Sequence, residues 1–276
     1  MNETTHKVLA GCGIGCLLAM IALAGLGWMG YRWTKTAVES AEGTVRSQVE
    51  LEERLGSIRD YTPPLDGAIP TERLETFLFV RESMATEREA LAAAVAEFAP
   101  AAGEGGTIGG LHAAKATMRM APRVLEFVSA RNQALLDADM GLGEYTWIYW
   151  LTCHGWLGHP PGESTLHDIL EQQADAGGNV QMDIHGWDAE EMTRELRRNV
   201  TAMVRNLHQA LKAEPEAGEL SEIVAAELAK IDDDPYRVPW QDGLPDALAF
   251  GLEPYRGRLE ASYSPSTNPF ELIEID

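Results

Sequence analysis

Side chains that could bind a metal gather in one stretch of the chain. Cys153 and His154 are adjacent, and His159 follows a few residues later. Cysteine thiolate and imidazole are common ligands of zinc and copper, and the turn expected at Pro160 and Pro161 could fold these side chains toward one another. Further potential ligands follow along the sequence: His167, Asp168 and His185. The stretch is therefore a candidate metal site, with Cys153, His154 and His159 as its first candidates.

The spacing of these residues matches no established metal motif. The sequence holds no Cys-x-x-Cys, no His-Glu-x-x-His and no repeated Glu-x-x-His, which are ligand patterns of zinc and di-iron sites. The tripeptide His-Gly-Trp occurs at 154–156 and again at 185–187, where it could equally close a helix end by hydrogen bonding and packing. Motifs for a serine nucleophile or a bound nucleotide are also missing, so no cofactor is predicted.

Two arginines fall on the apolar side of a well-marked helix that begins near Pro70. Arg81 and Arg88 lie on or beside the face formed by Leu74, Phe77, Leu78, Leu91 and Val95. A buried guanidinium group needs a carboxylate partner, because an unpaired charge is costly in an apolar environment. We therefore predict structural ion pairs for both arginines, in preference to a substrate clamp.

The N-terminal part of the chain is apolar enough to cross a membrane. From Val8 to Tyr31 there are 24 residues without a charge. At about 1.5 Å per residue, a helix of that length can cross a hydrocarbon core of about 30 Å. Trp28, Tyr31 and Trp33 follow at one end, as is typical of the boundary between headgroups and hydrocarbon. The sequence predicts a transmembrane anchor over 8–33, preceded by a short tail over 1–7.

Two processing signals compete with a retained anchor. The segment 9–12, Leu-Ala-Gly-Cys, resembles the lipobox of bacterial lipoproteins. An export signal needs about 7–15 apolar residues before its cleavage site, whereas here the apolar run follows the cysteine. The segment 22–24, Ala-Leu-Ala, has the pattern of an ordinary cleavage site, but cutting there would leave an apolar stub. We therefore favour a single-pass signal-anchor that stays on the protein.

Small residues form one face of the predicted anchor. Gly11, Gly15, Ala19 and Ala22 follow at helical spacing, and such a face permits close approach of two helices in lipid. Glycine and alanine are also simply common in membrane spans. This face is a candidate for self-association of the chain.

The charges around the anchor give little information on its orientation. Lys7 precedes the anchor and Arg32 and Lys35 follow it, which slightly favours a cytoplasmic C-terminal domain. An uncleaved N-terminal anchor before a large domain is most simply a signal-anchor whose C-terminal part is exported. We predict a cytoplasmic N-terminus and an exported domain. Because Cys153 is the one cysteine after the anchor, no disulfide within the domain is expected.

Helix-type spacing of apolar residues recurs along the remaining chain, and alternating strand-type patterns are scarce. We predict a juxtamembrane helix or stalk over 34–60, with Val45, Val49 and Leu55 on its apolar face. We then predict a linker over 61–70, an acidic helical domain over 71–231 and a C-terminal strap over 232–276. The strap is rich in proline and aromatic residues and is expected to pack on that domain. The predicted fold class is all-α, an irregular multi-helix bundle behind a transmembrane helix.

Two segments of the predicted domain have special compositions. The aromatic segment from Glu144 to Trp156 is too short to span a bilayer as a helix, so we expect it to be a central packing helix. The glycine-rich segment from Pro100 to Gly110 is expected to be a loop.

The charge balance limits the partners of the domain. After the anchor the chain carries 42 acidic and 20 basic residues, a formal net charge of −22. So acidic a surface repels phosphate backbones and anionic lipid headgroups, which argues against nucleic acid as a partner. We predict a non-catalytic protein- or ligand-binding module held at the membrane, with a protein partner. The alternative is a membrane-tethered metal-dependent enzyme that uses Cys153, His154 and His159.

Overall fold

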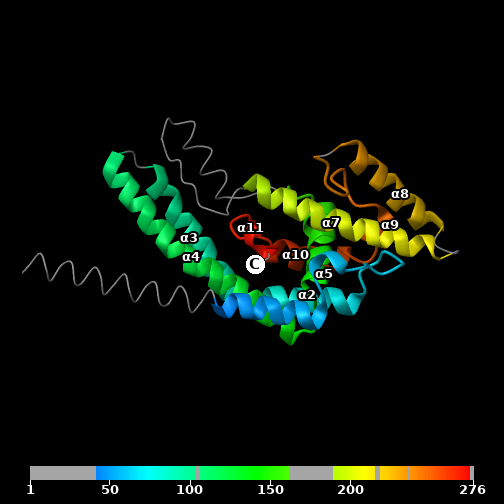
Figure 1. Cartoon of the computed structure of the whole chain (residues 1–276), viewed down its shortest axis with the longest axis horizontal. Coiled ribbons are helices and arrows are strands. Elements are labelled where there is room, and N and C mark those ends of the chain that lie inside the picture. Colours follow the sequence, from blue (N-terminus) through cyan, green and yellow to red (C-terminus); the bar gives the residue numbers. More distant parts are fainter. Residues whose placement is uncertain (1–41, 104–105, 162–188, 215–217, 235, 274–276) are drawn as a thin grey trace, which may run out of the picture. The chain divides into compact units, whose positions relative to one another are not determined.

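The structure of the chain is a computed structural model, and it describes residues 42–103, 106–161, 189–214, 218–234 and 236–273. Within these ranges the regular secondary structure is helical and contains no strand (Figure 1). The prediction of an all-α fold is confirmed. Thr44–Asp276 form one compact unit, and its buried apolar side chains make one continuous core.

The helical elements differ widely in length. In chain order they are residues 42–55, η1 (Ile58–Asp60), α2 (Thr71–Ser83), α3 (Ala85–Gly103), α4 (Gly106–Asp137), α5 (Leu142–Tyr149), η2 (Trp150–Trp156), α7 (Ala189–Lys212), α8 (Gly218–Asp233), α9 (Asp246–Ala249), η3 (Glu253–Tyr255), α10 (Arg256–Ser262) and α11 (Asn268–Glu271). Of these, η1 and η3 are 3-10 helices and η2 is a π-helix.

The long helices α3 and α4 lie side by side (Figure 1). They bury Leu91 and Val95 from α3 and Phe127 and Val128 from α4. The prediction of a loop from Pro100 to Gly110 was wrong, since α3 continues to Gly103 and α4 begins at Gly106. Alanine-rich sequence on both sides continues the two helices, because alanine has the highest helix propensity.

The aromatic segment forms the centre of the core. α5 runs directly into η2, and Tyr145, Trp147, Tyr149 and Trp150 are at most 1% exposed. The prediction that this segment is a central packing helix is confirmed. The π-helical turn at its end is notable, because π-helices are rare and occur frequently at functional sites.

The first described helix packs into the same core, but only partly through the face expected, since Leu55 packs against the core while Val49 does not. Thr44, Gln48 and Leu51 are buried, whereas Val49 is 48% exposed. Gln48 can be buried because its side-chain oxygen accepts a hydrogen bond from Asn132 on α4 at 3.1 Å. Hydrogen bonding between polar side chains thus allows Gln48 to face the core, which the spacing of apolar residues alone does not predict.

A glycine lets this N-terminal segment approach α5 closely. A Cβ atom on Gly143 would lie 2.5 Å from Cβ of Tyr61 and 3.1 Å from the carbonyl oxygen of Ile58. These separations are too short for a side chain, so glycine is required there. The described residues 44–60, which the sequence assigned to a stalk, therefore pack within the compact unit.

Two further helices, α7 and α8, pack against each other. Both contribute to the core, through Met203 and Leu207 from α7 and Val224 and Ile231 from α8. α8 runs beside α7 (Figure 1).

The C-terminal part combines short helices with irregular segments that contact the longer helices. α10 contacts α2, and α11 contacts α4. Trp240 and Phe270 are buried, whereas Tyr236 and Phe250 are 89% and 80% exposed. The aromatic side chains of this region thus fall into two groups, one in the core and one on the surface.

Candidate functional site

The structure places the three candidate metal ligands in or directly after η2. Cys153 is fully buried, and its Sγ lies 3.8 Å from the Thr152 hydroxyl. Burial raises the pKa of the Cys153 thiol to about 11, so the thiol stays protonated at neutral pH. The ring of His159 stacks on Tyr263 with 3.7 Å between the ring centroids. These side chains therefore have separate partners.

His154 is held as a neutral imidazole between aromatic rings. Its Nδ1 lies 2.8 Å from the carbonyl oxygen of His159, so Nδ1 carries the proton and donates it, because a carbonyl can only accept. Tyr149 and Trp150 contact the ring at centroid distances of 5.4 and 4.9 Å. Burial lowers the pKa of His154 to about 4, against the opposing effect of the Nδ1 hydrogen bond. Nε2 is buried without a hydrogen-bond partner among the described residues.

The positions of Cys153, His154 and His159 bear on the hypothesis that these side chains bind a metal. An Nδ1–H donated to a carbonyl with Nε2 left over is the usual state of a metal-bound histidine. However, no group of three or more His, Cys, Asp or Glu side chains able to hold a metal occurs within the described ranges. His167, Asp168 and His185 lie outside those ranges. The metal-dependent enzyme thus stays a prediction.

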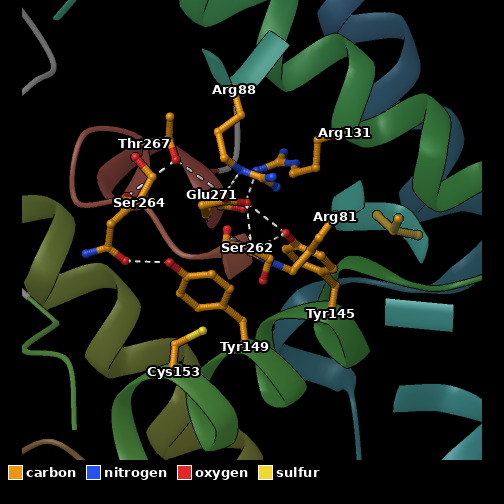
Figure 2. Close-up of polar contacts among 12 residues, drawn as sticks. Arg81, Arg88, Arg131, Tyr145, Tyr149, Cys153, Ser262, Ser264, Thr267 and Glu271 are labelled. Carbon is orange, nitrogen blue, oxygen red and sulfur yellow. Dashed lines mark hydrogen bonds and ion pairs between the residues drawn. The ribbon is translucent and has the colours of Figure 1, made fainter. Parts of the chain in front are cut away.

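A buried cluster of charged side chains lies at the centre of the core instead (Figure 2). Its members come from five helices: Arg81 from α2, Arg88 from α3, Arg131 from α4, Tyr145 from α5 and Glu271 from α11. We call these residues the Glu271 cluster. All are buried, with Arg88 the most exposed at 9%. The prediction that Arg81 and Arg88 need a carboxylate is confirmed, since both pair with Glu271.

Glu271 binds its neighbours through both carboxylate oxygens. Oε2 accepts a hydrogen bond from the Tyr145 hydroxyl at 2.7 Å and lies 3.2 Å from Nη1 of Arg81. Oε1 lies 3.4 Å from Nε of Arg88 and 3.5 Å from the Thr267 hydroxyl. Burial alone would raise the pKa of Glu271, but the positive charges of Arg81 and Arg88 and the Tyr145 hydrogen bond hold that pKa below its usual value.

Two of the arginines also hold the backbone of the C-terminal part. Arg81 donates to the hydroxyl of Ser262 at 3.0 Å and to its carbonyl oxygen at 2.5 Å. Arg131 donates to the carbonyl oxygens of Phe270 and Glu271, and to the side chain of Asn132 at 2.8 Å. Arg81, which pairs with the Glu271 carboxylate, and Arg131, which binds the Glu271 backbone, therefore fix the chain that carries this carboxylate.

Further hydrogen bonds extend the Glu271 cluster across the core. Asn132 joins Arg131 to Gln48 on the first helix. On the other side, the hydroxyl of Tyr149 donates to Asn268 at 2.7 Å, beside Cys153 (Figure 2). Sequence reasoning missed Glu271, because one glutamate among 43 acidic residues carries no distinguishing signal. Arg131 had a signal, because it shares a helical face with the buried Val128 and Leu135.

A second charged cluster joins α8 to the segment between α8 and α9. Arg237 is 8% exposed and donates from Nε to Glu227 at 3.1 Å and from Nη2 to Asp242 at 2.7 Å. Glu227 also accepts the backbone N–H of Trp240 at 2.8 Å and lies 3.4 Å from Nζ of Lys230. We call Glu227, Lys230, Arg237 and Asp242 the Arg237 cluster. It stabilises Trp240 in a left-handed backbone conformation with φ of 53°.

The membrane predictions concern residues that the structure does not describe. Trp28, Tyr31 and Trp33, and the helix-packing face of Gly11, Gly15, Ala19 and Ala22, all lie outside the described ranges. In the part of the chain that is described, no helix combines the length and the apolar character that crossing a bilayer requires.

Comparison with protein-family models, with curated proteins and with solved structures gives no match. Function is therefore argued from the chain's own residues.

Proposed function

We propose that this chain is a single-pass, membrane-anchored, non-catalytic module whose acidic helical domain binds a protein partner with a basic surface. One observation carries the proposal: the core takes up more basic than acidic side chains. In the described ranges, four arginines and two glutamates are buried, namely Arg81, Arg88, Arg131, Arg237, Glu227 and Glu271. Their burial removes net positive charge from the surface, so the surface is more acidic than the net charge of −22 after the anchor implies.

Helix α8 illustrates how this acidic surface is displayed. Glu219, Glu222, Asp232 and Asp233 are exposed, whereas Glu227 faces inward against Arg237. An extended surface of one sign attracts a partner of the opposite sign over distances beyond direct contact and raises the association rate. The proposal therefore expects complex formation that weakens as ionic strength rises.

The partner can be tested by purification from detergent-solubilised membranes at low ionic strength. We expect a stoichiometric basic protein to co-purify with the full chain and to be released by about 0.5 M salt, where charges are strongly screened. The double variant Glu219→Lys/Glu222→Lys should retain less of it. Glu50→Lys/Glu53→Lys, with the same change of net charge on the first helix, is the matched control.

Two results would contradict this proposal. One is the absence of any stoichiometric partner at low ionic strength. The other is a partner whose retention does not respond to salt or to either charge reversal, because such a complex would not depend on the acidic surface.

The anchor is supported by the uncharged run from Val8 to Tyr31 and by Trp28 and Trp33 beside it. We expect the full chain to sediment with membranes and to resist alkaline extraction, whereas a variant lacking residues 2–33 should remain in the supernatant. A reporter fused after Asp276 distinguishes an exported domain from a cytoplasmic one. Full-length chain in the supernatant after ultracentrifugation would contradict the anchor.

A further inference from the structure

The two oxygens of the Glu271 carboxylate are bound unequally. Oε2 has close partners in Tyr145 and Arg81, at 2.7 and 3.2 Å. Oε1 lies 3.4 Å from Arg88 Nε and 3.5 Å from the Thr267 hydroxyl, both at the long limit for a hydrogen bond. The side of Glu271 that faces Arg88 and Thr267 is therefore loosely coordinated (Figure 2).

Arg88 has an unsatisfied donor on this side of Glu271. Its Nη2 is buried and has no hydrogen-bond partner among the described residues, and the residue as a whole is 9% exposed. A buried donor on a charged group is among the most costly groups to leave unpaired, and native structures almost always satisfy it with protein, water or an ion. The described residues supply no acceptor for this donor, so its acceptor is to be sought beyond them.

Charge favours an anion over water as that acceptor. Arg81 and Arg88 both pair with the same carboxylate, Glu271, so two guanidinium charges share one negative charge in a buried setting. Arginine also presents its N–H groups in a planar fork that matches the oxygens of carboxylates and phosphates. We propose that Arg88 Nη2 and the Thr267 hydroxyl bind one small oxyanion, of the carboxylate or phosphate class, beside Glu271.

The two donors lie far apart in the sequence and meet at Oε1 of Glu271. Arg88 lies in α3, while Thr267 is fully buried directly before α11. The oxyanion therefore bridges a long helix to the C-terminal segment. Arg88 is the most exposed member of the Glu271 cluster, at 9%, so we expect the oxyanion to enter from its side.

Inorganic phosphate is the probe for this site. Equilibrium dialysis of the full chain in detergent against radiolabelled phosphate should show saturable binding of about one phosphate per chain. Arg88→Lys removes the fork and should weaken binding at least about tenfold, and Thr267→Val removes one neutral hydrogen bond and should weaken it about fivefold. Sodium acetate as competitor distinguishes the ligands: displacement indicates that carboxylates share the site, and its absence restricts the site to phosphates.

Matched variants on the surface control for nonspecific effects. Arg119→Lys alters an exposed arginine paired with Glu97, and Thr76→Val alters an exposed hydroxyl bonded to the backbone of α2. Both should bind phosphate within about twofold of the unchanged chain. The proposal is overturned if the unchanged chain shows no saturable binding, or if Thr267→Val binds as tightly as Thr76→Val. That second comparison decides the matter even if Arg88→Lys fails to fold.

Discussion

The Glu271 cluster and the Arg237 cluster differ in the balance of their charges and in their exposure to solvent. In the Glu271 cluster, three arginines surround one described carboxylate, and Arg81, Arg131 and Glu271 are fully buried. In the Arg237 cluster, two basic side chains, Arg237 and Lys230, contact the carboxylates of Glu227 and Asp242. Asp242 has a side chain that is 63% exposed. One cluster thus carries excess positive charge in the core, whereas the charges of the other balance and one of its carboxylates is exposed to solvent.

The difference shows that location, rather than the number of contacts, sets the energetic importance of an ion pair. A short pair in water contributes little, because solvent screens it and flexible side chains must be ordered. A buried pair contributes little compared with an apolar substitute, but removing one partner leaves an uncompensated buried charge. If the charge of Glu271 is removed, water cannot solvate the buried arginines in its place. If the charge of the exposed Asp242 is removed, water can.

The largest expected effect follows from Glu271→Gln, which keeps the side-chain shape and removes the charge that Arg81 and Arg88 share. We expect a loss of about 3–5 kcal/mol in the free energy of unfolding, the range for breaking a buried pair. Urea denaturation followed by tryptophan fluorescence would measure it. Glu260→Gln, at an exposed position on α10, is the control. A loss under about 1 kcal/mol would show that the core tolerates the uncompensated arginines.

Acid should remove the same stabilisation in the unchanged chain. The pKa of Glu271 is lower in the folded than in the unfolded chain, where it is about 4.3. Its ionised form therefore stabilises the fold at all pH values above about 4.3, and this stabilisation is lost as pH falls through the folded pKa. The stability difference between the unchanged chain and Glu271→Gln should shrink below about pH 4. A difference that stays constant down to about pH 2 would contradict this assignment.

Cys153 reports whether the Glu271 cluster also controls local opening. Its thiol is fully buried and its pKa is about 11, so reaction with a thiol reagent at about pH 8 requires the core to open. In a full chain carrying Cys12→Ser and Cys16→Ser, adding Glu271→Gln should accelerate labelling by about 100-fold, the equivalent of about 3 kcal/mol. Adding Glu227→Gln should accelerate it far less. Equal acceleration by both would remove the distinction between the clusters.

Sequence patterns predicted the helices and the main buried segment because these depend on local spacing. Local spacing was enough to recognise the aromatic run from Glu144 to Trp156 as a buried segment. It was also enough to show that Arg81 and Arg88 need a carboxylate partner. Glu271 could not, because it lies about 190 residues after Arg81 and nothing local marks it among many glutamates. A pairing of that kind is decided by tertiary packing.

The candidate metal site shows the opposite limitation. Cys153 and His154 are adjacent in sequence, which suggested joint action, but neighbouring residues of a helix project in different directions. Cys153 consequently lies beside Tyr149 and the Glu271 cluster, whereas His154 turns toward the carbonyl of His159. Proximity along the chain was a poor guide to proximity of functional groups within a helix.

An intermediate effect is expected at Glu227, which is 4% exposed but whose partner has a second carboxylate. In Glu227→Gln, Arg237 keeps Asp242, while the contact to the Trp240 backbone N–H becomes a weaker neutral one. We expect a loss of about 1–3 kcal/mol in the free energy of unfolding, the range for hydrogen bonds involving a charged group. Urea denaturation would measure it beside Glu271→Gln. A loss equal to that of Glu271→Gln would contradict the ranking by burial.

The smallest effect is expected at Asp242, despite its short 2.7 Å contact with Arg237. The hydrogen bond from Arg237 lowers the pKa of Asp242, but water solvates the carboxylate in both the folded and the unfolded chain. Asp242→Asn should therefore shift the urea midpoint by an amount close to the error of repeated measurements. Any shift should disappear at about 1 M salt, where the screening length falls to about 3 Å. A shift of the urea midpoint that persists at this salt concentration would mean that a contact of the native protein shields Asp242 from solvent. The two clusters would then not differ in solvent exposure, which is the basis of this comparison.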